Sequence, residues 1–110
     1  MLPVTARQLL HGLARVIHSV TAAQRRPFAL SFSTRAKLAE VVQRLVDAGV
    51  PLRQLSDHGT HQAVYVSDPD GNDLELAWDR PFDQWPRYSP ENAEYLDKPL
   101  DLDDLLAAAH

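Results

Sequence analysis

Side chains able to take part in acid–base or metal chemistry lie close together in the sequence: His58, His61, Tyr65 and Glu75. Imidazole and carboxylate groups bind divalent metals, and a phenol donates hydrogen bonds. Glu75 is the most informative of them, because it interrupts an apolar stretch. A carboxylate at such a position is disfavoured unless it has a partner or a task.

A β-hairpin is predicted to position Tyr65 and Glu75. Residues 62–67 and 74–78 are rich in β-forming residues, and the intervening Asp68-Pro69-Asp70-Gly71 fits a type I turn. Side chains alternate across a strand, so both Tyr65 and Glu75 point away from the apolar face of the hairpin. The apolar side chains of the two strands then face a common core.

The remaining elements are predicted from apolar periodicity and from capping residues. Thr5 begins the first helix, Ser33 or Thr34 caps the second, and Gly49 with Pro51 ends the second. The expected elements are a helix at 5–24, a strand at 28–33, a helix at 35–48, a brief strand at 52–55, the hairpin, and a short helix after Asp101.

This order predicts an α+β fold, a βαβββ unit preceded by an extra N-terminal helix. We divide the chain into an N-terminal helix at 1–26, the βαβββ module at 27–80, and an extended tail with a short helix at 81–110. The predicted core is Phe28, Leu30, Phe32, Leu38, Val42, Leu45, Val64, Val66, Leu74 and Leu76. The other face of the sheet is expected to form a shallow cup of Ala29, Ser31, Tyr65, Glu75 and Ala77.

Five motifs in order carry a family resemblance: Asp57-His58-Gly59, Tyr65, residues 68–72 (Asp-Pro-Asp-Gly-Asn), Glu75, and residues 78–81 (Trp-Asp-Arg-Pro). Together they resemble the vicinal-oxygen-chelate superfamily of glyoxalase I, bleomycin-resistance proteins and extradiol dioxygenases. The resemblance is closest to the C-terminal module of the catechol 2,3-dioxygenase-like branch. We expect it to run from about residue 28 to the C-terminus.

The resemblance implies roles for several residues. In the ring-cleaving relatives two His and one Glu hold Fe(II) or sometimes Mn(II), and Glu75 matches that Glu. Tyr65 matches a tyrosine that stabilises the bound catecholate, and His58 matches a histidine near the substrate. However, Pro27 stands where one metal His is expected, and the other comes from an upstream module. We therefore expect no cofactor, unless His58 or His61 rebuilds a site for Fe(II) or Mn(II).

Structural interpretations compete with these roles. His58 and His61 fit equally well as hydrogen-bonded histidines of the loop before the hairpin. Glu75 fits as the partner of an arginine such as Arg26 or Arg53.

Three functions remain open. The first is a truncated or degenerate glyoxalase/dioxygenase-like module that acts as a homodimer and binds a small hydrophobic or aromatic molecule. The second is a metal-dependent dioxygenase or lyase assembled across a dimer. The third is a structural interaction subunit that docks through its N-terminal helix, whose apolar stripe must be buried somewhere.

Composition narrows the classes of partner. The net charge of −4 is uneven, because residues 1–39 hold no acidic residue and the remainder holds all 15. The acidic majority disfavours nucleic-acid binding, and no apolar run approaches membrane-spanning length. An acid-free amphipathic start is also typical of transit peptides, which we disfavour here. The lack of cysteine fits a reducing compartment, and we expect a cytoplasmic protein.

Overall fold

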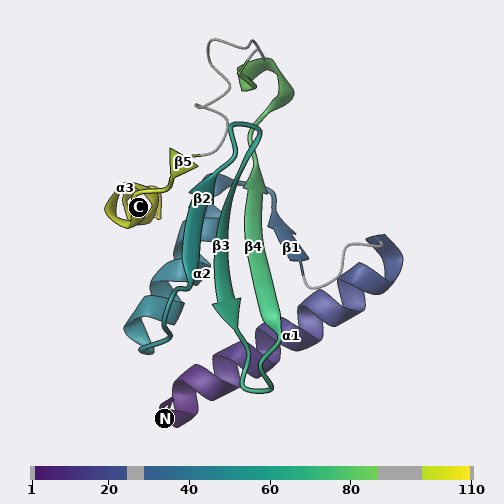
Figure 1. Ribbon diagram of the computed structural model, residues 1–110, viewed down its shortest axis with the longest axis vertical. Helices are drawn as coiled ribbons and strands as arrows, with labels where there is room; N and C mark the ends of the chain where they lie inside the picture. Colours follow the sequence, from purple (N-terminus) through teal and green to yellow (C-terminus); the bar gives the residue numbers. More distant parts are fainter. Residues whose placement is uncertain (1, 25–28, 87–97, 110) are drawn as a thin grey trace.

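A computed structural model describes residues 2–24, 29–86 and 98–109, and the side chains of these residues except 18–24. The elements, in order, are α1 (Val4–Gln24), β1 (Ala29–Phe32), α2 (Arg35–Asp47), β2 (Gln54–Asp57), β3 (His61–Ser67), β4 (Asp73–Asp79), the 3-10 turn η1 (Phe82–Gln84), β5 (Lys98–Pro99) and α3 (Leu102–Ala107) (Figure 1). The α+β class and the βαβββ order after a first helix are confirmed.

One mixed sheet contains all the described strands, in the order β1-β4-β3-β2-β5. β1 runs parallel to β4, and the other neighbouring pairs are antiparallel. Figure 1 shows the strands in front of α1 and α2, so the helices cover one face of the sheet. The opposite face is the one that the sequence predicted to be open.

The hairpin has the register that its apolar pattern predicts. Val64 pairs with Leu76 and Val66 pairs with Leu74, and these side chains are fully buried. The turn closes with a hydrogen bond of 3.0 Å from the Gly71 amide to the Asp68 carbonyl, as a type I turn requires. A shift of one residue would have exposed every one of these apolar side chains.

The predicted core is largely confirmed. Its fully buried members are Leu38, Val42, Leu45, Val64, Val66, Leu74 and Leu76, and each contributes roughly 1.5–3 kcal/mol by leaving water. Leu30 and Phe32 are half-buried and pack against this core, whereas Phe28 lies outside the described residues.

α1 packs on its own chain and belongs to the same core. Ala6, Leu10 and Ile17 are completely buried there, together with side chains of α2 and the sheet. The same helix leaves Val16 48% exposed, so only part of its apolar stripe is covered. The predicted need for a burial surface is thus met in part by the sheet itself.

Local signals placed the boundaries of α2 and α3. The Thr34 hydroxyl accepts a hydrogen bond of 3.1 Å from the Lys37 amide, and the carboxylate of Asp101 accepts one of 3.1 Å from the Asp104 amide. Both are N-cap contacts of the predicted kind. Gly49 follows the end of α2 with φ of 82°, the left-handed conformation that favours glycine.

Two features of the sheet differ from the prediction. β2 spans Gln54–Asp57 instead of residues 52–55, and the short strand β5 beside it was not predicted. The polar residues of β2 gave no apolar alternation to indicate a strand, and β5, its partner on one side, is distant in sequence. No helix among the described residues is long and apolar enough to cross a membrane.

Candidate functional site

The open face of the sheet is built from cross-strand rows. Tyr65 of β3 is paired with Glu75 of β4, which is paired in turn with Ala29 of β1. The next row on this face pairs Ala63 with Ala77, and beyond it His61 is paired with Asp79. The predicted grouping of Ala29, Ser31, Tyr65, Glu75 and Ala77 on one face is therefore correct.

Small side chains form the floor of this face. Ala63 and Ala77 are 0% and 2% exposed, and they separate the Glu75 row from the His61 row. Because alanine does not fill the space above the sheet, Glu75 and His61 lean toward each other across the floor. His61 Nε2 lies 3.9 Å from Glu75 Oε1, and each side chain is 31% exposed.

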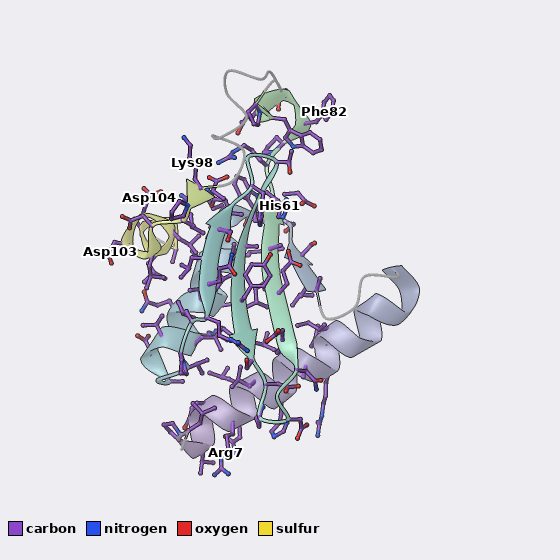
Figure 2. All side chains as sticks on the ribbon, in the orientation of Figure 1. Arg7, His61, Phe82, Lys98, Asp103 and Asp104 are labelled. Atoms are coloured by element: carbon purple, nitrogen blue, oxygen red, sulfur yellow. The ribbon has the colours of Figure 1, made fainter. Side chains whose placement is uncertain are left out.

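His61 corrects one interpretation of the sequence. We expected a loop histidine, but His61 is the first residue of β3 and shares the open face with Glu75. Its Nδ1 lies 3.1 Å from the Thr60 hydroxyl. In Figure 2 His61 lies near the end of the sheet from which the segment carrying Phe82 extends.

His58 lies in the connection between β2 and β3, as expected, and is brought against His61. The His58 amide donates a 2.8 Å hydrogen bond to the His61 carbonyl, and the two imidazole rings are 4.6 Å apart at an angle of 31°. The fold thus gathers His58, His61, Tyr65 and Glu75 at one face. Arg53, one proposed partner of Glu75, instead forms an ion pair of 2.7 Å with Asp73, and Arg26, the other, lies outside the described residues.

A polar network fixes the connection that carries His58. Both carboxylate oxygens of Asp57 accept hydrogen bonds from Arg80, at 3.1 and 3.2 Å. Gln62 and the Gly59 amide also donate to this carboxylate, at 3.0 and 2.9 Å. Burial opposes ionisation of Asp57, but the hydrogen bonds from Arg80, Gln62 and Gly59 outweigh it and lower its pKa to about 2.

No role was predicted for Asp57, Gln62 or Arg80 from the sequence. The network continues from Gln62, whose side-chain oxygen accepts a hydrogen bond of 2.8 Å from Arg35 of α2. Arg35 in turn forms an ion pair of 2.9 Å with Asp104 of α3. One sequence signal could have indicated this network. Asp57 and Arg80 carry opposite charges, flank the hairpin, and belong to two of the five recognised motifs.

The donor set does not fit the metal site of the ring-cleaving relatives. That site needs two imidazoles and a carboxylate on one face of the ion. Across residues 2–24, 29–86 and 98–109, no three His, Asp or Glu side chains are grouped to hold a metal ion. Pro27, at the expected position of a metal His, lies outside the described residues and has no imidazole.

Comparison with known families agrees with the motifs and the fold. Residues 7–76 match the model of the Glyoxalase/Bleomycin resistance protein/Dioxygenase superfamily. The chain belongs to this superfamily. The match begins at residue 7, not near residue 28 as expected, so it includes most of α1, and it ends within β4.

One curated relative is similar to the chain in sequence. The chain is 34% identical to Catechol-2,3-dioxygenase of Bacillus subtilis (strain 168) over 82 residues. This region is 74% of the chain but 28% of the relative, so the chain corresponds to a small part of that protein. No solved structure matches the chain significantly.

Proposed function

We propose that this superfamily member is a small-molecule-binding module that does not catalyse Fe(II)-dependent ring cleavage. The observation that carries the proposal is the open face of the sheet, where Tyr65, Glu75 and His61 gather, while no three His, Asp or Glu side chains of the described residues are grouped to hold a metal ion. In this proposal a small hydrophobic or aromatic molecule binds beside Tyr65 and Glu75, above the row of Ala63 and Ala77. Fold membership alone does not assign a reaction, so the site's own chemistry decides.

In this proposal Tyr65 and His58 contact the bound molecule. Glu75 is the residue that a metal such as Fe(II) or Mn(II) would use, but one carboxylate does not hold either ion tightly. The pair of Asp57 and Arg80 acts indirectly, because it holds the connection on which His58 lies.

The test is anaerobic reconstitution with Fe(II) or Mn(II), followed by metal analysis and an assay for extradiol cleavage of catechols. Catechol-2,3-dioxygenase of Bacillus subtilis is the positive control. We expect substoichiometric metal and no cleavage. Stoichiometric metal together with turnover that Glu75→Ala abolishes would overturn the proposal.

One contact favours a second candidate, a metal-dependent dioxygenase or lyase assembled across a dimer. His61 Nε2 already lies 3.9 Å from Glu75 Oε1, so a small movement would let both bind one ion. If this candidate is correct, His61→Ala and Glu75→Ala will each abolish metal binding. His11→Ala, which removes an exposed imidazole of α1, will leave metal binding unchanged and serves as the control.

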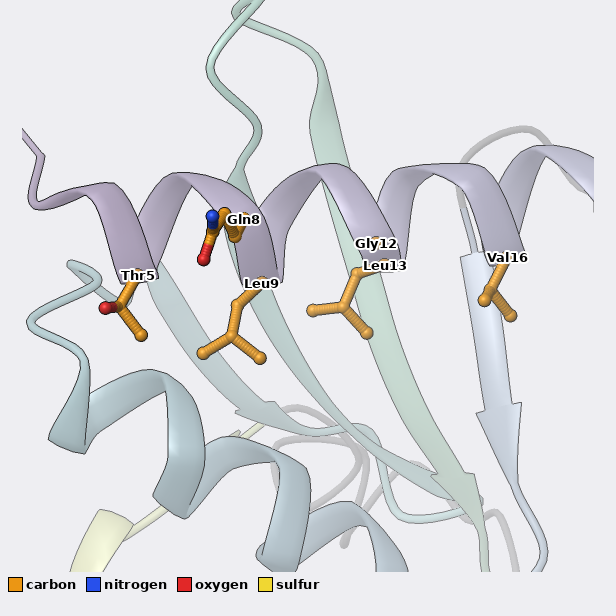
Figure 3. A pocket seen from close by; sticks show the side chains of 6 residues that line it. All are labelled: Thr5, Gln8, Leu9, Gly12, Leu13 and Val16. Atoms are coloured by element: carbon orange, nitrogen blue, oxygen red, sulfur yellow. The ribbon is translucent and has the colours of Figure 1, made fainter.

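We further propose that the chain is a homodimer. A groove of about 490 Å³ follows α1 and is lined by Thr5, Gln8, Leu9, Gly12, Leu13 and Val16. Figure 3 shows Leu9, Leu13 and Val16 along one side of the helix. An apolar groove of this kind supports burial against a second copy, and it would serve equally in an interaction subunit.

Light scattering at micromolar concentration tests the assembly. A mass of 12.3 kDa, that of one chain, would contradict the homodimer. Val16→Lys should weaken association because it places a charge in the groove. Val4→Lys, at a 59% exposed position outside the groove lining, is the matched control.

A further inference from the structure

Glu75 is an unusual carboxylate, because no described residue donates a hydrogen bond to it. Its nearest charged neighbour is His61, and the 3.9 Å between Nε2 and Oε1 is too long for a hydrogen bond. No lysine or arginine of the described chain lies within 4 Å of it. At 31% exposure the side chain is half-buried, where a carboxylate usually has a donor.

Two further carboxylates lie on the same face of β4 as Glu75. Asp79 lies on the same face of β4, in the His61 row, and Asp73 lies at the other end of the strand. The nearby cation, Arg53, is already engaged, at 2.7 Å from Asp73 and 2.6 Å from the Ser67 hydroxyl. Arg53 therefore compensates Asp73, whereas the carboxylate of Glu75 has no lysine or arginine partner among the described residues, which favours a cationic ligand over an anionic one.

Aromatic side chains adjoin the same position. Tyr65 is directly paired with Glu75, and directly opposed side chains have Cβ atoms about 4.5–5.5 Å apart. A cation bound to Glu75 is then within reach of the phenol ring, and a ring face attracts a cation. The imidazoles of His58 and His61, tilted by 31° to each other, lie at the other end of the alanine row.

We infer that the open face selects small aromatic amines in their protonated form. The ammonium group donates to the partly exposed Glu75, and the ring lies beside Tyr65, its cross-strand neighbour. This inference rests on the proposed binding function and adds the charge of the ligand to it.

A matched series of ligands tests the inference on the full chain. 2-Phenylethylamine, 2-phenylethanol and phenylacetate share a ring and a similar length but are cationic, neutral and anionic at pH 7. Affinity is measured by NMR titration, with the backbone amides of Ala63 and Ala77 as reporters. We expect the amine to bind roughly tenfold more tightly than the alcohol, and phenylacetate to bind least.

Variants separate a site effect from the overall charge. Glu75→Gln should reduce the preference for the amine over the alcohol to less than about twofold. Asp103→Asn removes the same charge from exposed α3, away from the open face, and should leave the preference intact. A thermal melt of each variant shows whether it is folded.

The outcomes distinguish the two proposals. Equal binding of the three compounds, or a preference for phenylacetate, would overturn the selection of amines while leaving small-molecule binding standing. A preference that survives in folded Glu75→Gln would also overturn it. If none of the three binds at millimolar concentration, both this inference and the proposed binding function fail.

Discussion

Asp57 and Arg80 form a two-point ion pair that joins the end of β2 to the residue after β4. Arg80 also donates a hydrogen bond of 2.5 Å to the Gly59 carbonyl, and its amide donates to the Thr60 carbonyl at 2.8 Å. These contacts fix both sides of the connection that carries His58. Two motifs that are widely separated in sequence are therefore one structural unit.

Removing the charge of Asp57 should destabilise the fold. We expect Asp57→Asn to lower the free energy of unfolding by about 1–3 kcal/mol, because the carboxylate accepts several hydrogen bonds in a half-buried position. Asp73→Asn is the control, since its ion pair with Arg53 is exposed and should contribute less than about 1 kcal/mol. Urea unfolding measures both, and equal losses would contradict the assignment.

The same carboxylate should make stability depend on acid pH. Its pKa is about 2 in the folded chain and 3.8 ordinarily, so the unfolded state binds a proton first as the pH falls. The contribution of Asp57 is complete above about pH 4 and is lost as the pH falls toward 2. Unfolding of the wild type and of Asp57→Asn between pH 2 and 6 should therefore converge at the acid end. Parallel curves would show that Asp57 is not the titrating group.

Two glycines should respond in opposite directions to alanine. Gly71 in the hairpin turn has φ of 88°, so Gly71→Ala should destabilise by about 1–2 kcal/mol through backbone strain alone. Gly12 lies within α1, and a Cβ there would meet nothing within 4 Å. Gly12→Ala should stabilise by up to roughly 1 kcal/mol, because alanine favours the helix. Thermal unfolding of the two variants checks the signs.

The packing of α1 makes a further prediction. Leu10 is completely buried, so Leu10→Ala should cost about 2–5 kcal/mol. Val16 is 48% exposed on the same helix, and Val16→Ala should change stability by less than about 0.5 kcal/mol. Chemical denaturation compares the pair. If Leu10→Ala were as mild as Val16→Ala, α1 would not be part of the core.

Short sequence motifs predicted those parts of the fold that depend on contacts between residues close in the sequence. The alternation around Tyr65 and Glu75 and the Asp-Pro-Asp-Gly turn were sufficient to give the hairpin, its register and its open face. The capping roles of Thr34 and Asp101 were equally readable, because each cap acts within a few residues. Long-range contacts were not: β5 has two residues, too few for a periodic pattern, and is defined only by its pairing with β2.

The candidate site residues were named from the sequence, but their spatial arrangement was not predicted. His61 looked like a loop residue, because the strand begins at it and no sequence pattern precedes it. Its approach to Glu75 depends on the small size of Ala63 and Ala77. The alternation of side chains did not predict how close this brings His61 to Glu75. The role of Asp57 required Arg80 to be brought beside it by the sheet.

The parallel pairing of β1 with β4 sets an order in which the chain can assemble. The hairpin of β3 and β4 needs only a tight turn and can form within microseconds. β1 must wait for β4, from which it is separated in the sequence by α2, β2 and β3, and this separation makes their pairing slow. During synthesis on the ribosome, α1 and β1 therefore emerge before their partner strand exists. The apolar side chains of Leu10 and Ile17 become fully buried only when the core that they share with α2 and the sheet has formed.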